Sequence, residues 1–228
     1  MIKKIFTIAL LMMILIVSGC FGNEQNKQQI QEGVLTVDDP ESITVLVNKQ
    51  YAFPEGYEPK DLVYPNVPFL FNEKIEKRMM REEAAKYLEK MFHAAKEQNI
   101  HLAGVSAYRS AQTQTVLFNN YVERDGIEKA KTYSAVPGTS EHQSGLAIDV
   151  SGSDGSCAVD DCFANTVEAA WLEENAHKYG YIIRFPKDKE NITGYQYEPW
   201  HIRYVGVNLA TELYNKGLTL EEYYEKHL

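Results

Sequence analysis

Two short segments of the sequence hold side chains that can bind a metal ion and move a proton. The first contains His142 and Asp149, and the second is the tetrad Glu-Pro-Trp-His at residues 198–201. Together they offer two imidazoles and two carboxylates. Three such side chains can hold a zinc ion and leave a fourth position for water. The sequence therefore predicts one zinc ion per chain with a spare carboxylate beside it.

The spacing in the first segment requires a turn. Residues 145–150 alternate, with Leu146, Ile148 and Val150 on one face and Asp149 on the other, as in a half-buried strand. His142 is an odd number of residues from Asp149, so one continuous strand would point the two side chains to opposite faces. We expect Ser144-Gly145 to form a turn that brings them together, with His142 just outside the strand.

The second segment cannot copy the helical His-Glu-x-x-His arrangement. Pro199 pushes the preceding Glu198 into an extended conformation. We expect a loop or bulge at residues 198–199 that leads into a strand over residues 200–204, which would place Glu198 and His201 at one site.

These motifs resemble a known family. Residues 140–149, Ser-Glu-His-Gln-Ser-Gly-Leu-Ala-Ile-Asp, followed by Glu-Pro-Trp-His, are similar to the S-x-H-x-x-G-x-A-x-D and E-x-W-H signature of the VanY/LdcB zinc D-alanyl carboxypeptidases, in the lysostaphin-type and D-Ala-D-Ala metallopeptidase superfamily. The resemblance covers residues 45–208. It implies that His142, Asp149 and His201 are zinc ligands and that Glu198 is the catalytic base.

Arg109 is the candidate for binding a substrate carboxylate. Ser110 can cap a helix that runs to about Asp125 and stops at Gly126. A guanidinium beside a helix N-terminus suits a carboxylate, because the planar fork binds two oxygens and the helix end adds partial positive charge. The resemblance implies the same role; a surface salt bridge is the alternative.

Three further residues are candidates for substrate binding. Gln114 lies one turn into the same helix and could hydrogen-bond the substrate backbone or be solvated. The resemblance implies that Ser140 helps to hold the peptide, although it could equally cap a turn. Trp200, between base and ligand, is expected to line the pocket. Family members often carry Tyr where Phe185 stands, so any role of that hydroxyl is missing here.

Zinc held by two neutral imidazoles and one carboxylate would acidify water and polarise a carbonyl group, and Glu198 would accept the proton. With Arg109 on the terminal carboxylate, only the last residue would be removed. The resemblance implies that this residue is D-alanine from peptidoglycan stem peptides. Hydrolysis of the D,D bond of a pentapeptide and of the L,D bond of a tetrapeptide both remain open, as does the third residue of the stem.

Two other classes of protein could use the same ligands. Two histidines and one carboxylate also form the facial triad of non-haem iron oxygenases. A non-catalytic lipoprotein could bind a metal or a cell-wall peptide. Neither has a use for Glu198, which favours the hydrolase.

The N-terminus reads as an export signal. Lys3-Lys4, an apolar run and Cys20 resemble a lipoprotein signal peptide over residues 1–20, with Cys20 lipidated at its end. An uncleaved anchor is the alternative. Polar residues 21–41 are expected to be a flexible tether, and residues 42–228 the catalytic domain, anchored to the outer face of a bacterial membrane.

Charge excludes one class of partner. The formal net charge is −9, and it falls to −11 without residues 1–20, which carry two lysines and no acids. Such a chain lacks the basic footprint that nucleic-acid binding needs. We expect a monomer whose partners are stem peptides and, through the lipid, the membrane.

The remaining pattern predicts an α+β domain, in which a small, mainly antiparallel sheet carries the metal and helices pack on it. Apolar residues are spaced as a helix over residues 82–98, and strands are expected at 43–47, 100–107 and 181–185. Two short helices are expected after Val207, the second with a Thr219/Glu222 capping box.

The cysteines and the other histidines are expected to be structural. Cys157 and Cys162 flank four residues of a polar loop, and in an exported protein a disulfide is the simplest interpretation. No histidine nearby completes a metal site there. We expect the remaining histidines to be surface or structural residues: His93, His101, His177 and His227.

Overall fold

The computed structural model describes residues 33–226. The compact unit begins at Val34, and strand β1 (Leu35–Thr36) pairs in parallel with β2 (Tyr51–Ala52). Residues 34–41 therefore belong to the folded unit, and the prediction that the tether extends to residue 41 is wrong. Among residues 33–226, no helix combines the length and apolarity needed to cross a membrane. The predicted signal peptide, Cys20 and residues 21–32 lie outside the described residues.

A four-stranded antiparallel sheet forms the centre of this unit. Its order is β5 (Leu102–Ser106), β6 (Ala147–Gly152), β8 (Glu198–Tyr204) and β7 (Tyr181–Phe185). A separate antiparallel pair joins β3 (Leu62–Val63) to β4 (Met80–Arg81). The small, mainly antiparallel sheet with packed helices is the predicted α+β fold.

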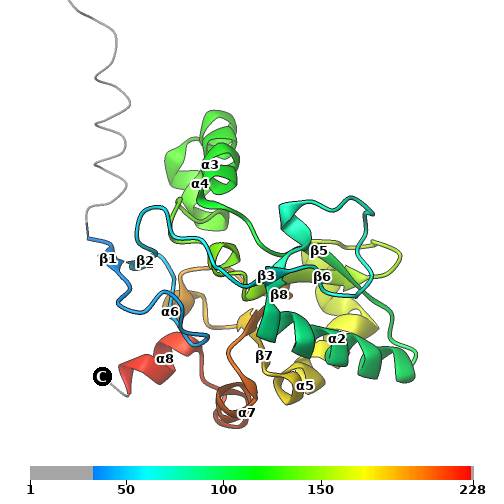
Figure 1. The fold of residues 1–228 in the computed structure, drawn as a ribbon. Helices are drawn as coiled ribbons and strands as arrows, with labels where there is room; N and C mark the ends of the chain where they lie inside the picture. Colours follow the sequence, from blue (N-terminus) through cyan, green and yellow to red (C-terminus); the bar gives the residue numbers. More distant parts are fainter. Residues whose placement is uncertain (1–32, 227–228) are drawn as a thin grey trace, which may run out of the picture. The chain divides into compact units, whose positions relative to one another are not determined.

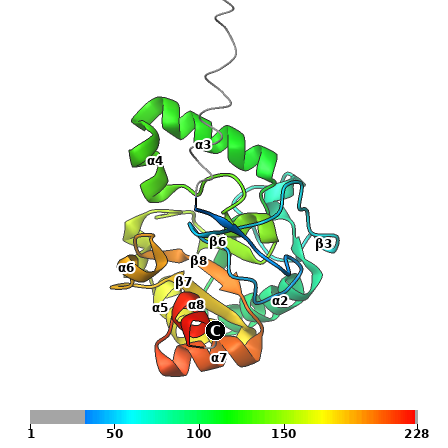
Figure 2. The ribbon, with the colours of Figure 1, turned by 90° about the vertical axis from the view of Figure 1, so that its left-hand side faces the viewer.

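Helices cover the sheet unevenly. Figures 1 and 2 show α3 and α4 on one side of the strands and α2, α5 and α7 on the other. The helices are α2 (Glu82–Glu97), α3 (Ala111–Asp125), α4 (Ile127–Tyr133), α5 (Val167–Asn175), α6 (Glu190–Thr193), α7 (Val207–Lys216) and α8 (Leu220–Glu225).

The main core lies between α2 and the sheet. All five apolar residues of the predicted α2 stripe are buried: Ala85, Leu88, Met91, Phe92 and Ala95. They share one cluster with Ile148 and Val150 of β6 and Ile202 of β8. Burial of this apolar stripe against the branched side chains of β6 and β8 stabilises the packing of α2 on the sheet.

Local end signals behave as expected from the sequence. The Ser110 side chain accepts a hydrogen bond from the Thr113 N–H at the start of α3, and Gly126 ends that helix. Thr219 and Glu222 form a capping box at the start of α8.

The predicted strand at residues 43–47 is wrong. The backbone there is irregular, and the carbonyls of Ile43 and Val45 accept hydrogen bonds from the Arg203 side chain, at 3.1 and 2.9 Å. Val45 and Val47 are buried in a small cluster with Phe53 and Tyr57. Val45 and Val47 therefore pack in a small core. The carbonyls of residues 43 and 45 bond to the buried Arg203 side chain instead of to a neighbouring strand.

Candidate metal centre and substrate cavity

Two of the predicted ligands are paired on neighbouring strands of the central sheet. Asp149 on β6 is directly opposite His201 on β8, and Asp149 Oδ1 lies 3.0 Å from His201 Nδ1. Both side chains are buried. Because neighbouring strands fix their side chains by hydrogen-bond register, this pair needs no loop to bring it together.

His142 comes from the predicted turn. It lies in a 3₁₀ helix, Glu141–Ser144, that ends at Gly145 with φ of 67°. The left-handed backbone at this position favours glycine, and a Cβ there would lie 2.8 Å from Leu62 Cδ2, so the Leu62 side chain would have to move. The turn places His142 Nε2 at 3.3 Å from Asp149 Oδ2.

The three side chains fit a zinc ion. The His142 Nδ1 atom lies 2.7 Å from the Ala107 carbonyl oxygen, which can only accept, so Nδ1 carries the hydrogen and Nε2 keeps its lone pair. One donor atom from each of His142, Asp149 and His201 lies within 4.8 Å of the others. Two imidazole nitrogens and one carboxylate at this spacing are the donor set of a catalytic zinc site.

Glu198 reaches the same region through an irregular strand. Phe185 on β7 pairs with Glu198, whereas Ile183 pairs with Ile202, so β8 has two more residues than β7 in this interval. Such a bulge re-aims side chains, and it explains how Glu198 and His201, an odd number of residues apart, both line one cavity. The bulge is where the sequence predicted a loop or bulge, except that Glu198 itself already belongs to the strand.

Burial and neighbouring charges shift the pKa values of Glu198 and Asp149 in opposite directions. Burial, reinforced by the carboxylates of Asp149 and Glu141, raises the pKa of Glu198 to about 7. Burial alone would also raise the pKa of Asp149, but His142 and His201 hold it well below its usual range. Burial lowers the pKa of His142. One carboxylate is therefore permanently charged and the other can exchange a proton near neutral pH.

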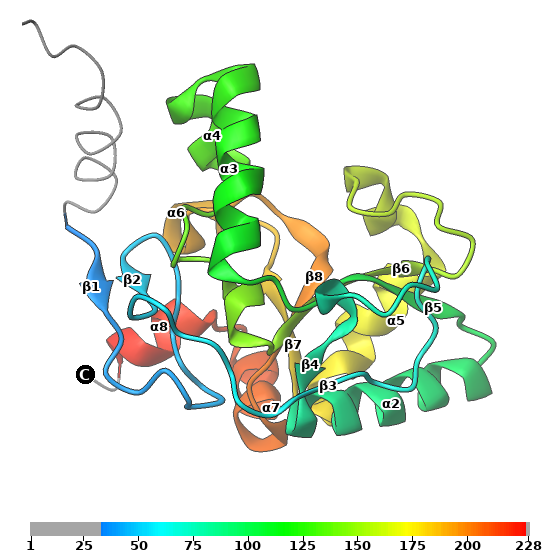
Figure 3. The ribbon, with the colours of Figure 1, turned by 45° about the horizontal axis from the view of Figure 1, so that its top comes forward.

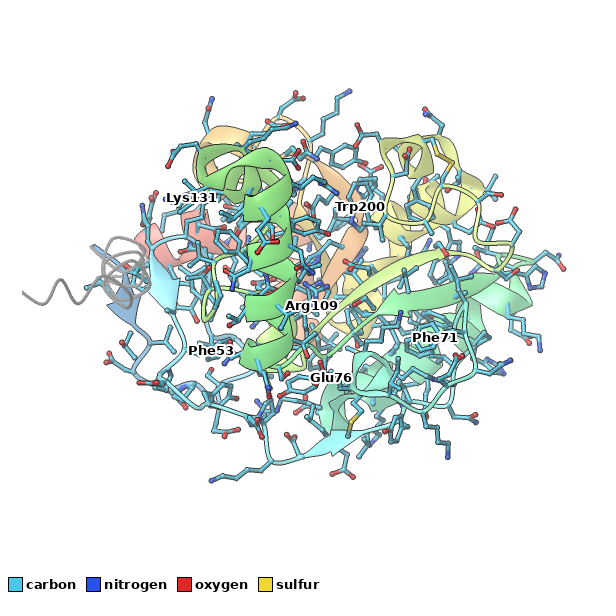
Figure 4. The ribbon with its side chains drawn as sticks, turned by 90° about the horizontal axis from the view of Figure 1, so that it is seen from above. Phe53, Phe71, Glu76, Arg109, Lys131 and Trp200 are labelled. Atoms are coloured by element: carbon cyan, nitrogen blue, oxygen red, sulfur yellow. A yellow bond between two sulfur atoms is a disulfide. The ribbon has the colours of Figure 1, made fainter. Side chains whose placement is uncertain are left out.

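A cavity of about 390 Å³ opens over these residues. Trp200 lines it, as expected, and so do Arg109 and Ser140, the candidates for binding the substrate. Figure 4 shows Arg109 beside α3 and Trp200 on β8. The backbone N–H of Arg109 also donates to the backbone carbonyl of His142 at 3.1 Å. This bond links the candidate carboxylate-binding residue directly to a candidate ligand.

Gln114 has a different environment from the one expected. It is fully buried, so the interpretation as a solvated residue is wrong, and it is not among the residues that line the cavity. Its side-chain oxygen accepts from Arg109 Nη1 at 2.9 Å, and its nitrogen donates to the Ala135 carbonyl at 2.6 Å. Gln114 therefore orients the Arg109 guanidinium, and its hydrogen bonds are already made within the protein.

The two walls of the cavity were not predicted from the sequence. Leu117 and Tyr121 of α3 and Tyr133 of α4 form one wall, and Val159, Asp160 and Asp161 form the other. Figure 3 shows these two segments on either side of β8. In the sequence, the apolar residues of both walls alternate with polar ones. This pattern is the same for a cavity wall and for an ordinary surface, so the sequence did not identify the walls.

The second wall is closed by the expected disulfide between Cys157 and Cys162. Val159, inside this loop, has φ of 55°, a conformation that is rare for a β-branched residue. The disulfide loop, residues 157–162, was expected to have a structural role only, but its residues 159–161 also line the cavity.

Phe185 lies against the metal centre. Its ring stacks on that of His201, with centroids 5.1 Å apart. The ring of Tyr195 is tilted against it, with centroids 4.5 Å apart. Tyr195 also lines the cavity, so a phenol is present near the site although residue 185 lacks one.

A buried charge cluster behind the site was also missed. Glu141 Oε1 accepts from Arg184 Nε and from Arg203 Nη1, each at 2.7 Å, and Arg184 binds Glu221 through two further hydrogen bonds. All four side chains are buried. The available signal was the position of each arginine inside an apolar strand, Tyr-Ile-Ile-Arg-Phe and His-Ile-Arg-Tyr, where an unpaired charge could not be tolerated.

The other histidines of the described residues stay apart from this centre. His93 is 4.0 Å from Glu97, and His177 stacks on Tyr214 with centroids 3.7 Å apart. Within residues 33–226 the only His/Cys/Asp/Glu group with metal-binding geometry is His142, Asp149 and His201. His227 lies outside the described residues.

The fold and the His/Asp/His centre define a metallopeptidase of the zinc carboxypeptidase type. Residues 77–207 match the model of the VanY D-alanyl-D-alanine carboxypeptidase family, and the chain belongs to this family. It is 52% identical to the Bacillus subtilis (strain 168) protein YodJ over 195 residues, 86% of this chain and 71% of YodJ.

Solved structures agree with this assignment. The LD-carboxypeptidase LdcB has 52% sequence identity and a TM-score of 0.82, over 86% of this chain and 91% of LdcB. A variant of the vancomycin-resistance D,D-pentapeptidase VanY in complex with Zn(II) has 34% identity and a TM-score of 0.64, over 79% of this chain and 97% of that one.

Proposed function

We propose that this protein is a zinc-dependent carboxypeptidase that removes the C-terminal D-alanine from peptidoglycan stem peptides. The observation that carries the proposal is the convergence of His142, Asp149 and His201 within 4.8 Å, in a cavity that also contains Glu198 and Arg109. Membership of the D-alanyl-D-alanine carboxypeptidase family supports the choice of substrate.

His142, Asp149 and His201 would hold one zinc ion per chain. Bound there, zinc supplies a Lewis acid that acidifies water and polarises a carbonyl group. The chain's own contribution is to present the donors in a fixed arrangement, because Asp149 and His201 are held by strand register and His142 by its hydrogen bond to Ala107.

Glu198 is the proposed proton carrier. With a pKa of about 7, its carboxylate can accept a proton from water and donate it to the departing amine, since a general base works best when its pKa lies near the working pH. A permanently ionised carboxylate such as Asp149 would hold a proton too weakly for the second step.

Arg109 is proposed to bind the terminal carboxylate of the substrate. Gln114 accepts from its Nη1 and Ser106 from its Nη2, which fixes the plane of the guanidinium at the N-terminus of α3. A fixed fork at a helix N-terminus selects a free carboxylate and so restricts cleavage to the last residue of a chain. Ser140 and Trp200 complete the wall around that residue.

The likeness to LdcB favours the L,D bond of a tetrapeptide stem as the preferred target, since both the identity and the TM-score are higher than for the D,D-pentapeptidase VanY. The D,D bond of a pentapeptide is the second candidate. The two substrates differ in the residue before the scissile bond, which must fit against the cavity walls.

We further propose that Cys20 is lipidated and anchors the enzyme, as a monomer, to the outer face of a bacterial membrane. This part is supported by the sequence of residues 1–20 alone. Replacement of Cys20 by alanine is expected to abolish labelling by radioactive palmitate and to release the protein from the membrane fraction. Unchanged labelling would contradict it.

Incubation of the full chain with defined tetrapeptide and pentapeptide muropeptides, followed by mass spectrometry, tests the enzymatic proposal. We expect a loss of one D-alanine, suppression by a chelator and recovery on addition of zinc. A product that lacks two residues at once, or turnover that a chelator does not affect, would overturn it. A protein that only binds the peptides would give no product under any of these conditions.

A further inference from the structure

The His201 ring is held between two carboxylates. Its Nδ1 faces Asp149 Oδ1 at 3.0 Å, and its Nε2 faces Glu141 Oε2 at 3.5 Å. The second distance is long for a hydrogen bond. Nevertheless, His201 Nε2 and Glu141 Oε2 are both buried, and neither has another hydrogen-bond partner within the described residues. Two buried polar atoms that face each other without alternatives are natural partners.

The Glu141 carboxylate cannot turn away from His201. Its other oxygen, Oε1, accepts from Arg184 and Arg203, each at 2.7 Å. Arg184 is held in turn by two hydrogen bonds to Glu221 of α8, at 2.6 and 2.9 Å. Nε and Nη2 of Arg203 donate to backbone carbonyls, including that of Val45 at 2.9 Å. A movement of the Glu141 carboxylate away from this position would therefore leave two buried guanidinium groups without their acceptor.

We infer that Glu141 is a positioning residue for the metal centre, which holds the hydrogen of His201 on Nε2 so that the Nδ1 lone pair is directed toward the ion. A neutral imidazole carries its hydrogen on one nitrogen only, and the partner of that nitrogen decides which one is free. The inference rests on the proposed function, because it takes His201 as a zinc ligand.

The variant Glu141→Gln tests this directly. The two arginines require an acceptor at the position of Oε1, so the amide oxygen of the glutamine must face them. Its NH2 group then points toward His201 Nε2. Two donors would face each other, and the imidazole would place its hydrogen on Nδ1, the nitrogen that zinc needs.

Glu221→Gln is the matched control. It also puts an amide against the buried Arg184 and removes one negative charge from the same cluster, but Glu221 bonds to Arg184 and Asn48 and not to His201. A general weakening of the cluster should lower the melting temperature of both variants. Only the loss of the His201 partner should affect the metal.

Zinc affinity of the full chain is measured by competition with a chromophoric chelator. For Glu141→Gln we expect a dissociation constant raised about 10- to 100-fold, the usual effect of removing an outer partner of a ligating histidine. For Glu221→Gln we expect a value close to wild type. Equal losses in the two variants, or an unchanged affinity in Glu141→Gln, would overturn the inference.

A second measurement needs no variant and covers the case in which Glu141→Gln does not fold. In the zinc-loaded wild-type chain labelled with ¹⁵N-histidine, nitrogen shifts distinguish the metal-bound atom from the N–H atom. We expect His201 to carry a slowly exchanging hydrogen on Nε2. A hydrogen on Nδ1 would overturn the inference, whereas a failure of the wild-type chain to bind zinc would overturn the proposed function itself.

Discussion

Asp149 on β6 and His201 on β8 are direct neighbours across one antiparallel ladder, with Oδ1 and Nδ1 3.0 Å apart. Two of the three proposed ligands are thus fixed by the register of the central sheet, and only His142 comes from a segment outside it. The position of His142 relative to the other two ligands therefore depends on the short turn that contains it.

Gly145→Ala should damage that turn. The substitution requires φ of 67° from a residue with a Cβ and brings that Cβ to 2.8 Å from Leu62. We expect a loss of roughly 1–3 kcal/mol in the free energy of unfolding, together with weaker zinc binding, because His142 must shift. Gly126→Ala is the control: φ there is 82°, but no atom lies within 4 Å of the added Cβ. If both variants bound zinc like the wild type, the turn would not determine the site.

Glu198→Gln should separate metal binding from turnover. The amide keeps the shape of the side chain but cannot accept a proton, so we expect zinc content to be retained and D-alanine release to fall roughly 10²–10⁴-fold. Glu174→Gln, an exposed residue of α5, should match the wild type. Activity within a few-fold of wild type in Glu198→Gln, measured on muropeptides by mass spectrometry, would remove Glu198 from the mechanism.

The pH dependence of kcat/KM should report the same residue. Burial raises the pKa of Glu198 to about 7, and a base is active only when deprotonated, so activity is lost as the pH falls through this pKa. A nearby cation favours the charged carboxylate, so with zinc bound the acid limb should lie at or below pH 7 but above the ordinary value of roughly 4.3. A profile that rises toward acidic pH would contradict this assignment.

Arg109→Ala should weaken recognition of a free C-terminus. Hydrogen bonds to charged groups contribute roughly 1.5–3 kcal/mol, so kcat/KM for free-carboxylate peptides should fall about 10- to 100-fold. Peptides with an amidated C-terminus should be affected much less. Gln114→Ala should act in the same direction but more weakly, since it only releases the guanidinium. Equal losses on both kinds of peptide would refute the carboxylate-binding role.

The double variant Cys157→Ser, Cys162→Ser should loosen one wall of the cavity. Val159, which lines the cavity, is held at φ of 55° inside the disulfide loop, and without the crosslink it is free to relax. We expect KM to rise more than kcat falls, because the proposed ligands and Glu198 lie on other segments. Steady-state kinetics on the tetrapeptide check this, and a loss confined to kcat would show that the loop acts on the chemistry instead.

Sequence patterns were sufficient where the signal was local. The α2 stripe, the Ser110 cap and the Thr219/Glu222 capping box depend on residues within a few positions of each other. The ligand set was also accessible, since its spacing and family resemblance name His142 and Asp149 without knowledge of the fold. The motif identified chemistry because ligand types are few and their order along the chain is characteristic.

The missed features all depend on long-range contacts. Arg203 binds the carbonyls of residues 43 and 45, about 160 positions away, and so prevents the strand that β-branched residues suggested there. Gln114 is buried because Ser134 and Ala135, which follow α4, lie against its side chain. Propensity describes a residue and its near neighbours, whereas these environments are made by segments that meet only in the folded chain.

The early start of the folded unit at Val34 would limit the reach of the enzyme from the bilayer under the proposed lipid anchor. With Cys20 lipidated as we propose, only residues 21–33 separate the lipid from the compact unit at Val34. A segment of that length spans at most roughly 50 Å when fully extended. An enzyme anchored in this way would be confined to stem peptides close to the outer face of the membrane.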